Sequence, residues 1–269
     1  MPRTKKTIIA LVIPAYNEAE NILHVLRDVR QFQKNYPHWQ VLPIVVNDGS
    51  TDHTEEVLLQ NHAEHPEVKI ISLPCRLGIG VAVKSGFRYA LNLGANAVLQ
   101  IDGDGQHPPS EIPKLVCPLL EGQADVVVGS RYVQGAGGIV STIYRRAGTW
   151  FFSKLLRLLV GVKIEDCTSG FRAFTRESAD FLYQNYGDEY PEVSAYVPLV
   201  KGGFRVLEVP VKMKIRIRGR SSITPLRTLY YVFYVSLETI LDRVRPVLHK
   251  TLKKKHNLTR VDRLKGAHR

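Results

Sequence analysis

The first 130 residues alternate between short apolar runs and stretches with helical spacing, and no other feature of the sequence constrains the fold as strongly. Continuous apolar strands separated by helices predict an α/β fold with a mostly parallel central sheet and helices on both faces. We expect strands at residues 7–13, 41–46, 68–73, 97–101 and 124–129, and helices near 18–33, 52–62, 79–93 and 110–121.

The second half of the chain predicts a continuation of the same domain. Its pattern indicates a helix at about 142–160, a strand near 171–174, a helix near 176–185 and an extended segment at 203–215. No internal repeat is present. We therefore expect one α/β domain over residues 1–225, followed by a separate C-terminal segment at 226–269.

Polar or glycine-rich turns follow all five predicted strands. In parallel sheets, ligands bind beyond the carboxyl ends of the strands, so these turns are expected to meet at one edge. Each turn alone fits ordinary turn chemistry; together they predict a cleft for a nucleotide and a metal. The turns begin at Pro14, Asn47, Arg76, Asp102 and Gly129.

Asp102-Gly103-Asp104 is the most informative turn. Two carboxylates two residues apart, just after a buried strand, can offer oxygen ligands to Mg²⁺ or Mn²⁺. Gln106 and His107 add nearby ligand capacity. The alternative is a polar turn without a ligand.

Other short patterns carry less information. Gly78 and Gly80 follow the third predicted strand, with Val83 where a dinucleotide fingerprint needs glycine, which excludes an NAD site. Asp48 stands directly at a strand end and favours ligand contact, whereas Asp52 fits a helix cap equally well.

The net charge of +12 is concentrated at the C-terminus. Residues 243–269 hold ten Lys or Arg and one Asp, a net of +9 that leaves +3 for the first 242 residues. The preceding residues 226–244 have apolar and aromatic side chains at helical spacing. Together these segments predict a peripheral anchor on an anionic membrane surface; the alternative is a core-docking helix with a solvated tail.

Three further observations bear on location and partners. The three cysteines are far apart in sequence and suit a reducing compartment. No apolar stretch is long enough to span a bilayer, and the run 8–13 predicts a buried strand rather than a signal peptide. The cluster 253–255 lacks interleaved aromatic residues, which disfavours a nucleic-acid partner. We expect a cytoplasmic protein, peripheral on the inner face of the membrane.

Seven segments, in this order, resemble the family 2 glycosyltransferases with the GT-A fold, and more narrowly the dolichyl-phosphate mannose synthases and polyprenyl-phosphate glycosyltransferases. Together they cover most of the chain, and the combination is specific for the family but not for the sugar. The segments are VIPAYNEAENI (12–22), VVNDGSTDHT (45–54), LGIGVAVKSGFRYA (77–90), LQIDGDGQHPP (99–109), VVVGSRYV (126–133), DCTSGFRAFTR (166–176) and IRGRSSITPLRTLYY (217–231).

The resemblance implies a role for each matched residue. The nucleotide base and ribose of the donor are held by Pro14, Ala15, Tyr16, Glu18 and Asp48. The donor diphosphate and a Mg²⁺ or Mn²⁺ ion are faced by Asp102 and Asp104, with Gln106 as a further ligand.

The resemblance also implies an acceptor site. Arg131, together with Arg145 or Arg146, is implied to bind an acceptor phosphate, and Arg216 to contact phosphates from a closing loop. Candidate catalytic residues are thus Asp102, Asp104, Arg131 and Arg216. The chain departs from the family pattern at Asn47, Arg76 and Lys84.

We therefore expect an inverting, metal-dependent glycosyltransferase that moves a sugar from a nucleotide-diphosphate sugar to a polyprenyl phosphate, dolichyl or undecaprenyl. A phosphate acceptor is already anionic and needs no general base, so carboxamide substitutions at Asp166, Glu189 and Glu192 are each expected to retain most activity. Three alternatives remain open: a hydroxyl acceptor, a sugar-1-phosphate nucleotidyltransferase, and a non-catalytic membrane-surface binding protein.

Overall fold

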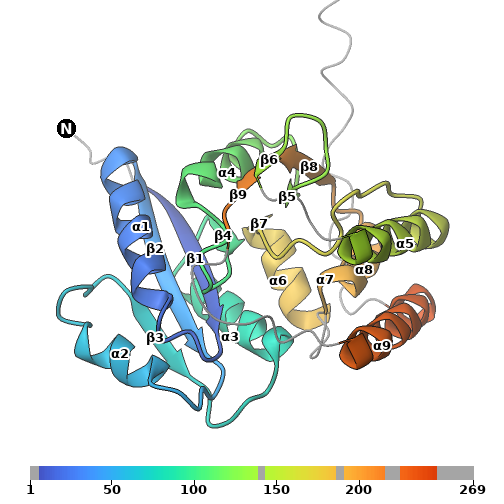
Figure 1. The fold of residues 1–269 in the computed structure, drawn as a ribbon. Coiled ribbons are helices and arrows are strands. Elements are labelled where there is room, and N and C mark those ends of the chain that lie inside the picture. Colours follow the sequence, from blue (N-terminus) through green and yellow to red (C-terminus); the bar gives the residue numbers. More distant parts are fainter. Residues whose placement is uncertain (1–5, 139–142, 186–190, 216–224, 247–269) are drawn as a thin grey trace, which may run out of the picture.

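The computed structural model of the chain describes residues 6–138, 143–185, 191–215 and 225–246. A seven-stranded sheet with the order β3-β2-β1-β4-β7-β5-β8 forms its centre (Figure 1). The strands are β1 (Thr7–Ala15), β2 (Trp39–Asn47), β3 (Lys69–Ser72), β4 (Ala97–Gln100), β5 (Val126–Ser130), β7 (Arg172–Thr175) and β8 (Val206–Pro210). Only β7 is antiparallel to its neighbours among these described strands, which confirms the mostly parallel α/β sheet.

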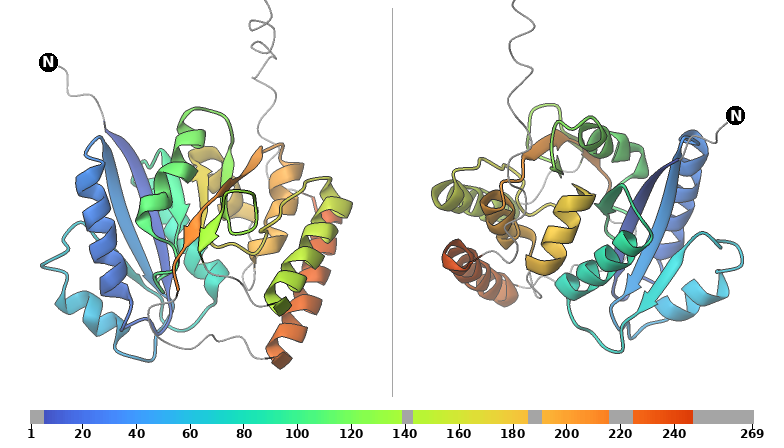
Figure 2. Two further views of the ribbon diagram at one scale, coloured as in Figure 1. Left: turned by 45° about the horizontal axis from the view of Figure 1, so that its top comes forward. Right: turned by 180° about the vertical axis from the view of Figure 1, so that it is seen from behind.

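Helices pack on both faces of this sheet (Figure 2). One face carries α1, α2 and α4, and the other carries α3, α5, α6, α8 and α9. The helices are α1 (Ile22–Asn35), α2 (Thr54–Gln60), α3 (Ile79–Asn92), α4 (Ile112–Leu120), α5 (Ile143–Val160), α6 (Arg176–Asn185), α7 (Pro191–Ser194), α8 (Tyr196–Lys201) and α9 (Pro225–Val244), with a short 3₁₀ turn η1 (Pro109–Glu111).

The apolar run near the N-terminus is a buried strand, as predicted. Side chains alternate across β1, so Ile9, Leu11 and Ile13 pack with α1 and α4, while Ala10 and Val12 pack with α3. All five are 0% exposed. The strand is covered on both faces, which agrees with its apolar sequence after Thr7.

Beyond small shifts at strand ends, the structure differs from the expectation in three respects. Helix α1 begins at Ile22 rather than near residue 18, because Asn17 adopts a left-handed backbone (φ 57°) and Glu18 lies in the turn before the helix. The extended segment 203–215 is divided into β8 and β9 (Lys212–Met213), and β9 pairs with β6 (Gly137–Gly138) in a second, two-stranded sheet. The sequence pattern did not indicate α7 and α8.

Helix α9 packs against α5, α7 and α8. Val235 and Thr239 are fully buried on its inner side. At its C-terminus, Lys201 Nζ donates to the carbonyl oxygens of Asp242, Arg243 and Arg245 at 2.9, 3.0 and 2.6 Å. A cation at this position satisfies the free carbonyl groups at the helix end. The predicted boundary at residue 226 remains a prediction, and none of the described helices has the length and apolar character needed to cross a membrane.

Candidate active site

The loops after β1, β2, β4 and β5 lie at one edge of the sheet. These strands run in the same direction, since β7 is antiparallel to both β4 and β5. Glycine packing brings two of the loops together: a Cβ on Gly103 would lie 3.2 Å from the carbonyl oxygen of Pro14 and 3.6 Å from Glu18 Cγ. The loop with the two aspartates therefore rests on the predicted donor-binding loop.

Asn17 connects the loops after β1 and β2. Its backbone N–H donates to Ser50 Oγ at 3.0 Å, and its Oδ1 accepts the N–H of Thr51 at 2.8 Å. From the other loop, Asp52 accepts the N–H groups of Ala19 and Thr54. Asp52 is thus a cap and a link between loops, and these contacts fix the backbone around Tyr16.

Asp48 is buried and holds the loop after β3. Its Oδ1 accepts the N–H of Leu77 at 2.7 Å and its Oδ2 accepts the N–H of Gly78 at 3.0 Å. The same loop places the Arg76 guanidinium 4.2 Å from the centre of the Tyr16 ring. Asp48 therefore acts on the shape of the predicted nucleotide site by fixing the loop that carries Arg76; its direct contact with a donor remains a prediction.

Asp102 and Asp104 belong to one tight loop beyond β4. The side chain of Asp102 is 34% exposed, and Asp104 is 9% exposed. Asp104 Oδ1 accepts the N–H of Gln106 at 3.0 Å across a turn in which Gly105 has φ 79°. The turn orients the Asp104 carboxylate within the loop.

The oxygen donors of this loop fit Mg²⁺ or Mn²⁺. In the described part of the chain, no three His, Cys, Asp or Glu side chains group together as a complete metal site. Two carboxylates and the Gln106 amide form an incomplete set, and Mg²⁺ sites commonly take their remaining ligands from substrate phosphates and water. The metal ligands that this loop offers therefore fit a site that a phosphorylated substrate would complete.

Arg131 forms a buried ion pair with Asp166. Its Nε and Nη2 donate to the two carboxylate oxygens, both at 2.7 Å, and its backbone N–H donates to Oδ2 at 2.9 Å. Burial disfavours the charged guanidinium, but hydrogen bonds and attraction to Asp166 outweigh it and raise the pKa of Arg131. Asp102 contributes to the same rise, which places its charge near Arg131.

A second, half-buried carboxylate supports this ion pair. Glu208 on β8 accepts the N–H groups of Glu165 and Asp166 at 2.6 and 2.8 Å. Burial raises the pKa of Glu208, although these two hydrogen bonds oppose the rise. The position of Arg131 thus depends on a chain of contacts from β8 through Asp166.

Tyr132 brings two of the predicted acceptor-binding arginines together. The guanidinium carbons of Arg131 and Arg146 lie 5.4 and 5.8 Å from the centre of its ring. Arg146 is exposed near the start of α5, whereas the side chain of Arg131 is 10% exposed. The sequence analysis did not single out Tyr132, although it directly follows Arg131.

Not every predicted residue can be placed. Arg216 and Glu189 lie outside the described residues, and the side chain of Arg145 is likewise outside them. Of the carboxylates considered as bases, Asp166 is engaged by Arg131. Among the described residues, the buried Oε2 of Glu192 has no hydrogen-bond partner, and burial raises the pKa of Glu192 although Arg172 opposes this.

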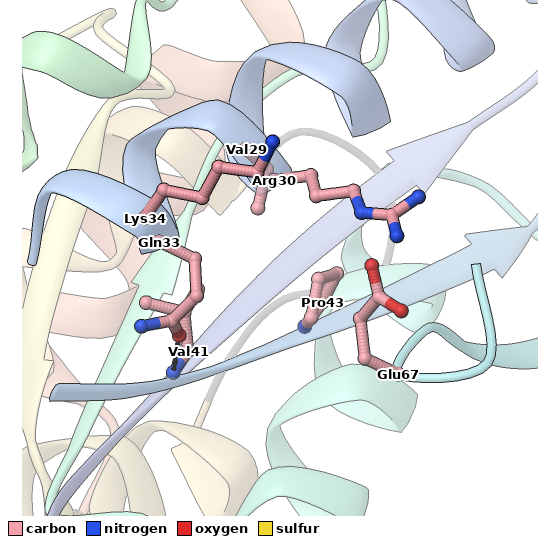
Figure 3. A pocket seen from close by; sticks show the side chains of 7 residues that line it. All are labelled: Val29, Arg30, Gln33, Lys34, Val41, Pro43 and Glu67. Atoms are coloured by element: carbon pink, nitrogen blue, oxygen red, sulfur yellow. Dashed lines mark hydrogen bonds between the residues drawn. The ribbon is translucent and has the colours of Figure 1, made fainter. Parts of the chain in front are cut away.

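A separate cavity of about 310 Å³ lies between α1 and β2 (Figure 3). It contacts the first half of β2, far from the end at Asn47, and Arg30 and Glu67 point toward one another across it. The Gln33 amide in its wall is already used by backbone groups of Tyr36, Trp39 and Val41. This cavity is remote from the predicted site residues. Its lining is Val29, Arg30, Gln33, Lys34, Val41, Pro43 and Glu67.

Comparison with known proteins gives a consistent result. Residues 10–182 match the family described as Glycosyl transferase family 2. Over 261 residues the chain is 30% identical to a polyprenol monophosphomannose synthase of Mycolicibacterium smegmatis, covering 91% of this chain and 92% of the relative. Over 219 residues it is 30% identical to an undecaprenyl-phosphate mannosyltransferase of Micrococcus luteus, covering 79% and 86%.

The fold is also similar to solved structures. Glucosyl-3-phosphoglycerate synthase from Mycobacterium tuberculosis, in complex with Mn²⁺, uridine diphosphate and glucosyl-3-phosphoglycerate, superposes with a TM-score of 0.61 at 20% identity. The match covers 90% of this chain and 81% of that one. This similarity confirms the expected GT-A fold.

Proposed function

The chain belongs to glycosyl transferase family 2 and is a glycosyltransferase, and from that premise we propose that it transfers a sugar from a nucleotide-diphosphate sugar to a polyprenyl phosphate at the cytoplasmic face of a membrane. The grouping of Arg131 and Arg146 about Tyr132, with Asp102 nearby, carries the acceptor assignment. Arg146 is an exposed cation, and together with Arg131, whose charge is shared with Asp166, it suits a second phosphate in addition to the donor diphosphate.

The donor side of the proposal rests on the loops after β1 and β4. Asp102, Asp104 and Gln106 would hold Mg²⁺ or Mn²⁺ together with the diphosphate of the sugar donor, because their side chains offer the oxygen ligands that these cations prefer. When bound, such an ion offsets negative charge that develops on the leaving nucleoside diphosphate. The Tyr16 loop, fixed by Asn17, would position the nucleoside.

The reaction needs no proton transfer with this acceptor. A phosphate oxygen attacks the anomeric carbon from the face opposite the leaving group, and the new O–C bond forms as the C–O bond to the nucleotide diphosphate breaks. The electron pair of the broken bond leaves with the diphosphate. Arg131 and Arg146 would orient the attacking phosphate, which lowers the entropic part of the barrier. The engagement of Asp166 by Arg131 agrees with a reaction that uses no carboxylate base.

The membrane part of the proposal rests on α5 and α9, which lie side by side in both views of Figure 2. Large apolar side chains are exposed on these two helices, and Lys154 lies 5.7 Å from the Trp150 ring. A surface of aromatic, aliphatic and basic residues suits the boundary between lipid headgroups and acyl chains. The exposed apolar residues, hereafter the α5–α9 face, are Trp150, Phe151, Leu158, Phe233, Leu237, Ile240, Leu241 and Val244.

The test of the acceptor is a direct comparison of acceptor classes. The chain is incubated with Mn²⁺ and a panel of sugar nucleotides (GDP-mannose, UDP-glucose, UDP-N-acetylglucosamine), using a short polyprenyl phosphate or the matching polyprenol in detergent. We expect a glycosylated lipid with the phosphate and none with the alcohol. Product from the alcohol but not from the phosphate would favour the hydroxyl-acceptor alternative, and formation of a sugar nucleotide from a sugar 1-phosphate would favour the nucleotidyltransferase.

One substitution separates acceptor binding from donor binding. Arg146→Ala should raise the KM for polyprenyl phosphate about tenfold, the value of one charge-assisted hydrogen bond, without changing the KM for the donor. Arg157→Ala is a matched control, because Arg157 is also an exposed arginine on α5 but lies three turns further along the helix. If both substitutions change the KM for polyprenyl phosphate equally, Arg146 is not part of the acceptor site.

A further inference from the structure

His107 contacts Asp102 twice, although it lies five residues further along the chain. The backbone N–H of Asp102 donates to His107 Nδ1 at 3.0 Å. On the other side of the ring, His107 Nε2 lies 3.7 Å from Asp102 Oδ2. One imidazole ring therefore touches both the backbone and the carboxylate of the same aspartate.

The first contact determines which ring nitrogen of His107 carries the proton. A backbone N–H can only donate, so Nδ1 must be the accepting nitrogen and cannot carry a proton. In a neutral imidazole the proton then resides on Nε2, the nitrogen that faces the Asp102 carboxylate. Nδ1 is also unavailable as a metal ligand, which removes His107 from the ligand capacity that the sequence indicated.

The ring itself is held in place by its surroundings. His107 is 5% exposed, and its ring stacks on Phe171 with centroids 4.8 Å apart and planes 10° from parallel. Next to Phe171, Gly170 packs on the Asp102 carboxylate so closely that a Cβ there would lie 2.9 Å from Oδ1. Residues 170 and 171 thus restrain both the imidazole and the carboxylate that it faces.

We propose that His107 is a positioning residue that sets the Asp102 carboxylate in a metal-binding orientation before any ligand arrives. The inference rests on the proposed role of Asp102 in holding Mg²⁺ or Mn²⁺. Removal of a group that hydrogen-bonds to a metal ligand and orients it commonly lowers metal affinity by about 10-fold to 100-fold. A preset carboxylate does not have to be reoriented when the metal and the donor bind.

Two substitutions separate the two contacts. The side-chain amide of Asn is as far from Cα as Nδ1 of histidine, so His107→Asn keeps an acceptor for the Asp102 N–H. The amide of Gln is one bond longer and reaches the position of Nε2, so His107→Gln keeps a donor toward the carboxylate. His107→Ala removes both contacts.

The experiment measures Mn²⁺ affinity of the full chain by calorimetric titration with GDP or UDP present, beside the melting temperature without metal. We expect His107→Ala to weaken Mn²⁺ binding about tenfold or more, and His107→Asn to recover most of that loss. We also expect the kcat of His107→Ala to fall at saturating donor and limiting Mn²⁺ and to be restored by added Mn²⁺.

The outcomes distinguish this inference from the proposed function. If the unaltered chain binds Mn²⁺ and all three variants bind it equally well, His107 only stabilises the fold and the inference is wrong. A folded His107→Asn protein that shows no recovery also overturns it. If the unaltered chain with nucleotide binds no Mn²⁺, the proposed metal role of Asp102 fails first and the inference fails with it.

Discussion

Asp104 is oriented by its own loop, because its Oδ1 accepts the N–H of Gln106. Asp104→Asn keeps the size and an accepting oxygen but removes the charge. We expect kcat to fall about 100-fold or more, since a lost metal contact removes several kcal/mol of transition-state stabilisation, while the urea midpoint of unfolding changes little. Asp28→Asn is the control, because Asp28 is half-exposed and, in the described part of the chain, pairs with Lys214 on the surface. Full activity in excess EDTA would contradict the metal assignment.

Asp166 shows how the structure changes an expectation. The sequence predicts that Asp166→Asn retains most activity, but the side chain is 0% exposed and both of its oxygens bind Arg131. We now expect the substitution to lower the free energy of unfolding by about 3 kcal/mol, as for other buried pairs that lose one partner, and to raise the KM for the acceptor.

Urea unfolding of two matched variants tests this expectation. Asp125 makes a comparable pair with Arg205, but that pair is open to water, with side chains 25% and 49% exposed. Asp125→Asn should therefore cost about 1 kcal/mol or less. If Asp166→Asn is no more destabilising than Asp125→Asn and the acceptor KM is unchanged, Asp166 does not position Arg131.

The sequence could locate Asp102 and Asp104 but not the pairing of Arg131. A strand pattern followed at once by two carboxylates places both on one loop, and local spacing is enough for that prediction. Arg131 and Asp166 are 35 residues apart and meet only because the chain returns after α5 to insert β7 between β4 and β5. Local patterns carry no information on such a return, and the two contacts of His107 depend on Phe171 and Gly170 from the same returning segment.

At the scale of elements, periodicity predicted the long helices and the buried strands. It missed α7 and α8, which have 4 and 6 residues and are too short to show a helical repeat. It also described α9 by two alternatives, anchor or docked helix. The structure gives α9 a buried side at Val235 and Thr239, as the docked description expects, and an exposed side that includes Phe233 and Leu237. The anchor description stays a prediction and concerns the exposed side.

The α5–α9 face gives the prediction at this scale. Leu158 on α5 is 82% exposed, and Leu59 on α2 is 60% exposed at the far end of the molecule (Figure 1). Leu158→Glu should weaken binding to liposomes that contain anionic phospholipid about tenfold or more. The substitution replaces an apolar side chain that would be buried in the bilayer with a charge that the acyl region disfavours. Leu59→Glu should leave liposome binding unchanged in the same sedimentation assay. Equal binding by both variants would exclude this face as the membrane contact.

At the scale of the whole molecule, the predicted donor site and the predicted membrane contact lie on different elements. The predicted donor site lies at the edge of the sheet where β1, β2 and β4 end, and helices α5 and α9 lie on the other side of the molecule from β3 and α2 (Figures 1 and 2). Arg146 is close to both, since it is on α5 and faces Tyr132. Under the proposed function, an acceptor with a phosphate head and an apolar tail would place its head beside Arg131 and Arg146, while its tail follows α5 into the lipid.

The basic tail gives the last prediction. The place of truncation matters, because cutting after Asp242 would remove Arg243 and Arg245, whose carbonyl oxygens bind Lys201 at the end of α9. Truncation after Pro246 keeps that contact and removes eight Lys or Arg and one Asp, a net of +7. Each basic residue near an anionic leaflet contributes up to ~1 kcal/mol, less at higher salt. We therefore expect the truncated chain to lose most of its affinity for anionic vesicles at low salt, to behave like the full chain on neutral vesicles, and to retain kcat with a short acceptor in detergent. Unchanged affinity for anionic vesicles would show that the tail is not the anchor, and lost activity in detergent would show that it belongs to the catalytic domain instead.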